Sequence, residues 1–134
     1  MSFLDKLFWR RLFHKGQIIQ ALTVANNTFV AVGNSGTILI SDTNGQTWHS
    51  KNSGTSNTLN SIAFGNNTFI ATGHSGTILI STDYGHTWHS KNSGTSNTLS
   101  GISFINNNFI AFADFDTILI STNGGHTWNS ASLQ

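Results

Sequence analysis

The sequence predicts an all-β fold built from three tandem copies of one unit, and three observations predict it. The string at 36–41, Gly-Thr-Ile-Leu-Ile-Ser, recurs at 76–81 and, with Asp in place of Gly, at 116–121. A Thr-Trp pair follows each string at the same interval. The stretches around these strings are short and rich in Ile, Val and Phe, with Asn, Gly and Asp between them. A period near 40 residues made of short strands is typical of β-propeller blades.

The repeat is regular enough to place its boundaries. Aligning 17–56 with 57–96 gives 24 identities in 40 positions without a gap, and aligning 57–94 with 97–134 gives 21 in 38. We therefore predict blade 1 over 16–56, blade 2 over 57–96 and blade 3 over 97–134. A β-solenoid or prism is the alternative, but the coils of such folds usually have shorter periods.

Each unit is predicted to hold four strands, and the second copy shows why. Its apolar stretches are separated by Asn, Gly and Asp at positions where tight turns form. No stretch within the unit has the period of a helix. The strands that we expect in this copy cover 59–64, 68–72, 77–81 and 87–90.

Composition and charge exclude several classes of function. Charged residues make up 8% of the chain, against about 25% in typical soluble domains. Lys6, Arg10, Arg11 and Lys15 lie in the first 15 residues, so the repeats are slightly acidic and are not predicted to bind nucleic acid. The chain has no Cys, which excludes disulfides and thiolate metal sites and favours a reducing, cytoplasmic location.

A turn motif closes each unit. Residues 81–88 read Ser-Thr-Asp-Tyr-Gly-His-Thr-Trp, in which Ser and Asp oxygens can accept backbone N–H groups. The glycine supplies a positive φ, and the tryptophan packs beneath the turn. In the other copies Thr43 and Asn123 stand at the Asp position. The residues to which we assign this structural role are Ser41, Gly45, Thr47, Trp48, Ser81, Asp83, Gly85, Thr87, Trp88, Ser121, Asn123, Gly125, Thr127 and Trp128.

Over residues 17–131 this arrangement resembles the blades of BNR/Asp-box propellers, in particular those of photosystem II assembly-factor-like proteins. The resemblance implies a propeller with the box between the third and outermost strands. It does not imply photosynthesis, because the motif marks a scaffold. Sialidases share the box, but their chemistry uses an arginine cluster, a Tyr nucleophile and acidic partners. Here Glu is absent, both Arg residues precede the repeats and Tyr84 is a turn residue, so no catalytic residue is predicted.

The third copy departs from the others at one loop. Gly-Asn-Ser-Gly at 33–36 and Gly-His-Ser-Gly at 73–76 become Ala-Asp-Phe-Asp at 113–116. In propellers this loop joins the face where ligands usually bind. It is therefore a candidate binding loop, with adaptation to a neighbouring subunit and sequence drift as alternatives. The candidate ligand-face residues are Asn34, His74, Asp114, Phe115 and Asp116.

No metal or cofactor is predicted. The six histidines include pairs at equivalent positions of different copies, which should lie on separate blades, whereas a metal site needs several to converge. Lectin propellers hold sugars with aromatic groups between blades, a role that could be imagined for Trp48, Trp88 and Trp128, although such tryptophans are more often buried.

The leader, residues 1–15, is predicted to form an amphipathic helix. Lys6, Arg10 and His14 would form a polar stripe on an otherwise apolar and aromatic helix. It lacks the features of a secretory signal and is too short to span a bilayer. Three interpretations stay open: binding at a membrane surface, docking on the propeller or a partner chain, and disorder.

Three blades leave two open flanks, which invite association. Two chains paired head to tail would give six blades with C2 closure, whereas three chains would give nine, outside the usual range. We therefore predict a homodimeric six-bladed propeller that acts as a non-catalytic binding or scaffold module. The alternatives are a glycan-binding lectin and a recently amplified or laboratory-made repeat protein with no specific ligand.

Overall fold

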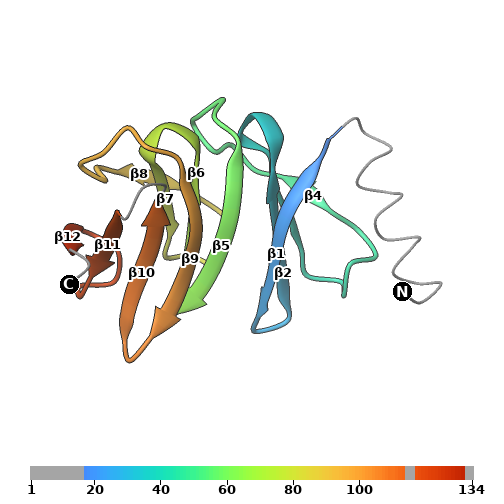
Figure 1. The fold of residues 1–134 in the computed structure, drawn as a ribbon. Helices are drawn as coiled ribbons and strands as arrows, with labels where there is room; N and C mark the ends of the chain where they lie inside the picture. Colours follow the sequence, from blue (N-terminus) through green and yellow to red (C-terminus); the bar gives the residue numbers. More distant parts are fainter. Residues whose placement is uncertain (1–16, 114–116, 132–134) are drawn as a thin grey trace, which may run out of the picture.

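The computed structural model describes residues 17–113 and 117–131. They form three separate four-stranded antiparallel sheets (Figure 1). The all-β prediction with four strands in each unit is therefore confirmed, and the sheets are consistent with propeller blades. The predicted leader helix and the loop residues Asp114, Phe115 and Asp116 lie outside the described residues. The described part of the chain holds no helix with the length and hydrophobicity needed to cross a bilayer.

Each sheet is a meander in which neighbouring strands follow one another in the chain. Blade 1 holds β1 (Ile19–Ala25), β2 (Thr28–Gly33), β3 (Ile38–Ser41) and β4 (His49–Ser50). Blade 2 holds β5 (Leu59–Gly65), β6 (Thr68–Gly73), β7 (Thr77–Ser81) and β8 (His89–Lys91). Blade 3 holds β9 (Leu99–Ile105), β10 (Asn108–Ala113), β11 (Ile118–Ser121) and β12 (Asn129–Ala131). Short 3₁₀ turns, η1 (Asn34–Gly36) and η2 (His74–Gly76), follow β2 and β6.

The outermost strand of blade 2 begins two residues later than predicted, at His89 rather than Thr87. Thr87 instead closes the preceding turn, because its N–H and its hydroxyl both donate to Asp83, at 2.9 and 2.6 Å. A backbone N–H used in this way is not available for the strand ladder.

Paired asparagines make the hairpin between the first two strands of every blade. In blade 2, Asn66 and Asn67 both have positive φ, at 51° and 58°, and the other two hairpins repeat this geometry. A two-residue hairpin with positive φ at both positions matches the right-handed twist of the strands it joins. Asparagine tolerates that conformation better than most side chains.

Successive connections of a meander lie at opposite ends of the sheet, so the loops of each blade gather at two opposite ends. We call the end with η1 and η2, together with the inter-blade linkers 51–58 and 91–98, the loop face. The opposite end carries the Asn-Asn hairpins and the turns at 41–48, 81–88 and 121–128, and we call it the turn face.

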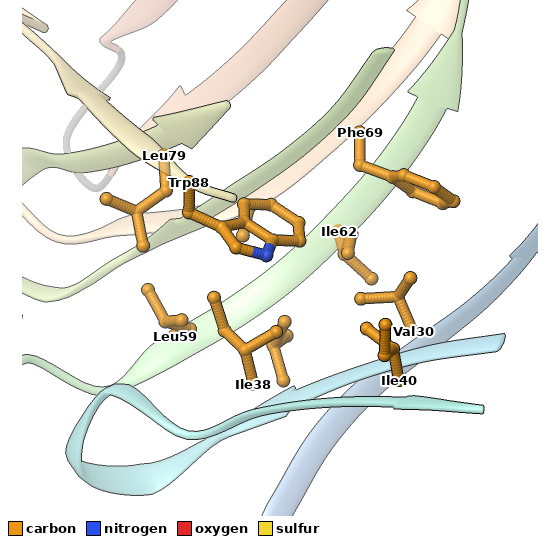
Figure 2. Packing of buried hydrophobic residues seen from close by; sticks show 10 residues of the cluster. Val30, Ile38, Ile40, Leu59, Ile62, Phe69, Leu79 and Trp88 are labelled. Carbon is orange, nitrogen blue, oxygen red and sulfur yellow. The ribbon is translucent and has the colours of Figure 1, made fainter. Parts of the chain in front are cut away.

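The main cores lie between blades. In the first, Val30, Val32, Ile38 and Ile40 of blade 1 pack against blade 2. Figure 2 shows Trp88 of blade 2 among Leu59, Leu79 and Ile38. We call the blade-1 side a leading face and the blade-2 side a trailing face. The trailing-face residues of blade 2 are Leu59, Ile62, Phe69, Ala71, Leu79 and Trp88.

The second core repeats the first one period later. Ile70, Ile78 and Ile80 form the leading face of blade 2. The trailing face of blade 3 is formed by Leu99, Ile102, Phe109, Ala111, Leu119 and Trp128. The blades are therefore held together by one type of contact, used twice.

Thr72 is the polar exception within this contact. It occupies the position of Val32 one blade later and is fully buried, yet its Oγ1 forms no hydrogen bond within the described part of the chain. A buried hydroxyl without a partner loses its hydration without compensation.

Thr72→Val is therefore expected to raise the free energy of unfolding by about 1 kcal/mol, measured by urea denaturation. The matched control is Thr68→Val on the same strand, because Thr68 Oγ1 donates to the Asn66 carbonyl at 3.1 Å. That change should lower stability by a similar amount. Two effects of the same sign would contradict this account of Thr72.

Candidate functional site

The turn at 81–88 is a closed network of hydrogen bonds. The Gly85 N–H donates to Ser81 Oγ at 2.8 Å, and Ser81 Oγ donates to Asp83 Oδ1 at 2.8 Å. The Trp88 indole N–H donates to the Gly85 carbonyl at 2.8 Å. Together with the two bonds from Thr87, these contacts occupy both oxygens of Asp83. The carboxylate therefore organises the turn.

The other two copies build the same turn with different chemistry. In blade 1, Thr43 Oγ1 accepts from the Thr47 N–H at 2.9 Å. In blade 3, Asn123 Oδ1 accepts from the Thr127 N–H at 3.0 Å, and its Nδ2 donates to Thr127 Oγ1 at 2.7 Å. The Ser–Gly and Trp–Gly bonds recur in both, through Ser41, Gly45 and Trp48 and through Ser121, Gly125 and Trp128.

The pKa of Asp83 reflects this network. Partial burial alone would raise the pKa, but the hydrogen bonds from the Thr87 side chain, the Thr87 backbone and Ser81 outweigh it. With a smaller contribution from the charge of His86, they lower the pKa from 3.8 to about 2. Hydrogen bonds to the charged form are the cause, because the proton must displace donors that already occupy the oxygens.

This shift gives a pH-dependent contribution to stability. A pKa that is lower in the folded state contributes stability above about pH 3.8 and loses it as the pH falls toward 2. After solvent screening the contribution is about 1 kcal/mol. Asp83→Asn should remove this dependence in urea denaturation between pH 2 and 5. Asn123→Asp should add a second contribution in the same window, and a pH profile unchanged in both variants would contradict the assignment.

Tyr84 has a role that the sequence did not predict. Its hydroxyl donates to Asn67 Oδ1 at 3.1 Å and accepts from Asn26 Nδ2 at 3.0 Å. Its ring stacks on Phe64 at a centroid distance of 6.3 Å. Tyr84 therefore links blades 1 and 2 at the turn face. The equivalent positions are Asn44 and Gly124, and the unique aromatic residue was the available signal.

The loop face presents different side chains on one repeated backbone. The Thr37 and Thr77 hydroxyls donate to the carbonyls of Asn34 and His74, at 2.7 and 2.6 Å. The N–H groups of Asn34 and His74 donate to main-chain carbonyls of the residues just before β1 and β5, at 3.0 and 2.9 Å. No side chain at position 34 or 74 is needed for these bonds. The position can therefore vary without altering the loop.

The side chains at this position have different surroundings. Asn34 Oδ1 accepts from Gln20 Nε2 at 3.0 Å. His74 is exposed. On the next inner strand, Asn60 Nδ2 donates to the Leu99 carbonyl at 3.3 Å. The structure thus brings Asn34 and His74 to the loop face, where the first strands of blades 1 and 2 contribute the amide groups of Gln20 and Asn60. The other candidate residues, at 114–116, lie outside the described part.

The structure also bears on the tryptophans as sugar-stacking groups and on the histidines as metal ligands. Trp88 and Trp128 are buried between blades, so they are not placed to stack on a bound sugar. Over residues 17–113 and 117–131, no three His or Asp side chains gather closely enough to hold a metal ion.

Repeated four-stranded meanders packed face to face define the chain as a set of β-propeller blades. No protein-family model and no curated protein sequence matches it. Among solved structures, it is similar to YCF48 bound to a D1 peptide, with 19% identity, a TM-score of 0.72 and coverage of 85% of this chain and 40% of that one. It is also similar to YCF48 from Cyanidioschyzon merolae, with 18% identity, a TM-score of 0.72 and coverage of 85% and 37%.

An ancestral GH74 enzyme is similar as well, with 21% identity, a TM-score of 0.65 and coverage of 82% of this chain and 18% of that one. These identities support a shared fold and nothing finer. The chain spans 40% or less of each of these proteins. Because an enzyme stands among them, the fold alone does not decide whether a propeller catalyses a reaction.

Proposed function

We propose that this chain is a non-catalytic propeller module that binds an extended segment of a partner protein on its loop face. The observation that carries the proposal is the pair of loops η1 and η2. Their backbone is fixed by main-chain atoms and threonine, while the displayed side chain changes from Asn34 to His74. A constant scaffold that displays variable polar groups suits recognition.

The chemistry of the loop face fits a peptide. Gln20, Asn34 and Asn60 carry amides that both donate and accept, and His74 adds an exposed imidazole. An extended peptide presents alternating N–H and C=O groups that such side chains can pair with. The structure of YCF48 with a D1 peptide supports the proposal by showing that a protein of this fold can hold a peptide.

A second part of the proposal concerns assembly and attachment. A second copy of the chain completes the propeller to six blades. The turns at 41–48, 81–88 and 121–128 act as Asp-box turns, and the high identity between copies reflects amplification of one unit. Residues 1–15 attach the module to a membrane surface or to a partner protein.

The test is binding of the intact chain to a library of defined unmodified peptides, measured by fluorescence polarisation. For the best peptide, His74→Ala and Gln20→Ala should each weaken binding by about tenfold. The matched control is His86→Ala, because His86 is exposed on the turn face.

Equal losses in all three variants would contradict binding on the loop face. Specific hits on a glycan array, with no peptide bound, would instead favour the lectin alternative.

A further inference from the structure

The two internal interfaces show what a leading face of this chain requires. Val30 and Ile70 occupy equivalent positions, and both are fully buried by the following blade. The glycine of the following turn packs directly on this face. A Cβ at Gly85 would lie 3.2 Å from Ile40, and one at Gly125 would lie 2.4 Å from Ile70. Each leading face therefore lies in close contact with the turn glycine of the trailing face that covers it.

Blade 3 carries a leading face of the same kind that no described residue covers to this extent. Ile110 pairs with Ile120 and Phe112 with Ile118, in the register of Val30–Ile40 and Val32–Ile38. The three isoleucines are only partly buried, and Phe112 is 41% exposed. This face therefore has the register of the two covered leading faces, but its side chains remain partly exposed.

Blade 1 carries a matching trailing face. Ile19, Ala31 and Leu39 are already buried in a small cluster with Trp48. The uncovered part of this trailing face includes Leu22, which is 38% exposed although its equivalents Ile62 and Ile102 are buried. Phe29 and Gly45 are also only partly buried, whereas Phe69, Phe109, Gly85 and Gly125 are buried.

One pair of positions shows that these two ends fit each other. Where blade 2 meets blade 3, the ring of Phe104 lies over Gly65, so that an added Cβ would lie 2.2 Å from it. The equivalent residues at the first interface are Phe64 and Ala25, which pack on the same cluster.

On the leading face of blade 3 and the trailing face of blade 1, the sizes of the two residues are reversed. The position of Gly65 becomes Ile105, and the position of Phe104 becomes Val24. The side chain on the leading face is therefore larger than at the internal interface, and the side chain on the trailing face is smaller. Both side chains are half exposed in the single chain, at 48% and 52%. Compensating volumes of this kind are expected of residues that pack together.

We infer that the leading face of blade 3 binds the trailing face of blade 1 of a second copy of this chain, with Ile105 packed against Val24. The contact repeats the register of the two internal interfaces. The inference rests on the second copy in the proposed function and names the residues that select it. Two such contacts close a ring of two chains.

The first test is charge complementation, measured by sedimentation and native mass spectrometry. Val24→Lys and Ile105→Asp each place a charge in both contacts of a homodimer. Each variant should therefore weaken dimerisation by more than about tenfold. A mixture of the two holds one unchanged contact and one Lys–Asp contact, so it should form a heterodimer of twice the 14.5 kDa chain mass. The control mixture, Val24→Lys with Ile105→Lys, also keeps one unchanged contact but places two lysines in the other, so it should associate more weakly than the Lys–Asp mixture.

The second test uses volume instead of charge. Val24→Phe should weaken the dimer by about tenfold, because the ring meets Ile105. Adding Ile105→Gly in the same chain recreates the Phe104–Gly65 pair and should restore the affinity. The two residues lie on the first and third blades of the arc (Figure 1), so coupling between them requires contact between chains.

The outcomes separate the inference from the proposed function. A dimer whose affinity responds additively, without rescue in either test, would overturn the inference and leave the six-bladed ring in place. A protein that stays monomeric at micromolar concentration would overturn both the contact and the ring. Peptide binding on the loop face is measured independently of either.

Discussion

Replacing Trp88 with alanine is expected to lower the free energy of unfolding by about 3–5 kcal/mol. Trp88 is 8% exposed and lies in the core between blades 1 and 2 (Figure 2). Its loss removes contacts with both blades and the indole bond to the Gly85 carbonyl. The cavity cannot be closed by collapse of one sheet, because rigid elements on both sides line it.

The repeat supplies a control for this substitution. Trp48 occupies the same turn of blade 1, and its indole N–H also donates to the turn glycine, at 2.9 Å. It is only partly buried, so Trp48→Ala should cost about half as much in dilute protein. Urea denaturation followed by far-ultraviolet circular dichroism measures both. Equal costs in dilute protein would show that the inter-blade position of Trp88 contributes nothing.

Protein concentration separates the two variants further. In the proposed dimer, the trailing face of blade 1 lies against a second copy, so stability depends on concentration through mass action. The difference between the native chain and Trp48→Ala should therefore grow as the concentration rises. The difference caused by Trp88→Ala, whose contacts lie within one chain, should grow less.

The pair Trp48 and Trp88 also shows what could be predicted from sequence. Both close equivalent turns, so the local pattern predicts the same packing beneath the turn, and both form the same indole bond. Their different burial depends on whether another blade lies on that side, which no local pattern contains. The strands follow from residue type and spacing, whereas the neighbour of each face follows from the arrangement of whole blades.

In the candidate site too, local contacts could be predicted from the sequence, whereas contacts between blades could not. The motif predicted the local bonds of Asp83, because all of its partners lie within four residues. It did not predict that Tyr84 would reach Asn26, which is 58 positions away. It also assigned Gly85 to a positive φ alone, whereas the leading face of blade 1 sets a second requirement at that position.

Gly76→Ala is expected to cost about 3 kcal/mol or more. Gly76 lies in the left-handed region, with φ at 71°, which disfavours any side chain. In addition, a Cβ would lie 1.9 Å from the Thr95 carbonyl oxygen and 2.8 Å from Ser93 Oγ. Since the first obstacle is backbone, either the η2 loop or the linker after blade 2 must move.

Gly94→Ala in that linker isolates the two effects. Gly94 has a similar φ, 79°, but a Cβ there would meet nothing within 4 Å. It should therefore cost only the conformational penalty of about 1 kcal/mol. Urea denaturation followed by tryptophan fluorescence measures both variants, and the difference of about 2 kcal/mol reports the contact between loop and linker.

The same contact links stability to the proposed binding face. Gly36 repeats the geometry in blade 1, where a Cβ would lie 1.9 Å from the Thr55 carbonyl oxygen. Each linker is therefore packed on the loop that displays Asn34 or His74, and displacing it should alter the display. Gly76→Ala should weaken peptide binding as well as folding, while Gly94→Ala should leave binding unchanged. Unaltered binding by folded Gly76→Ala protein would show that the linker does not position the loop.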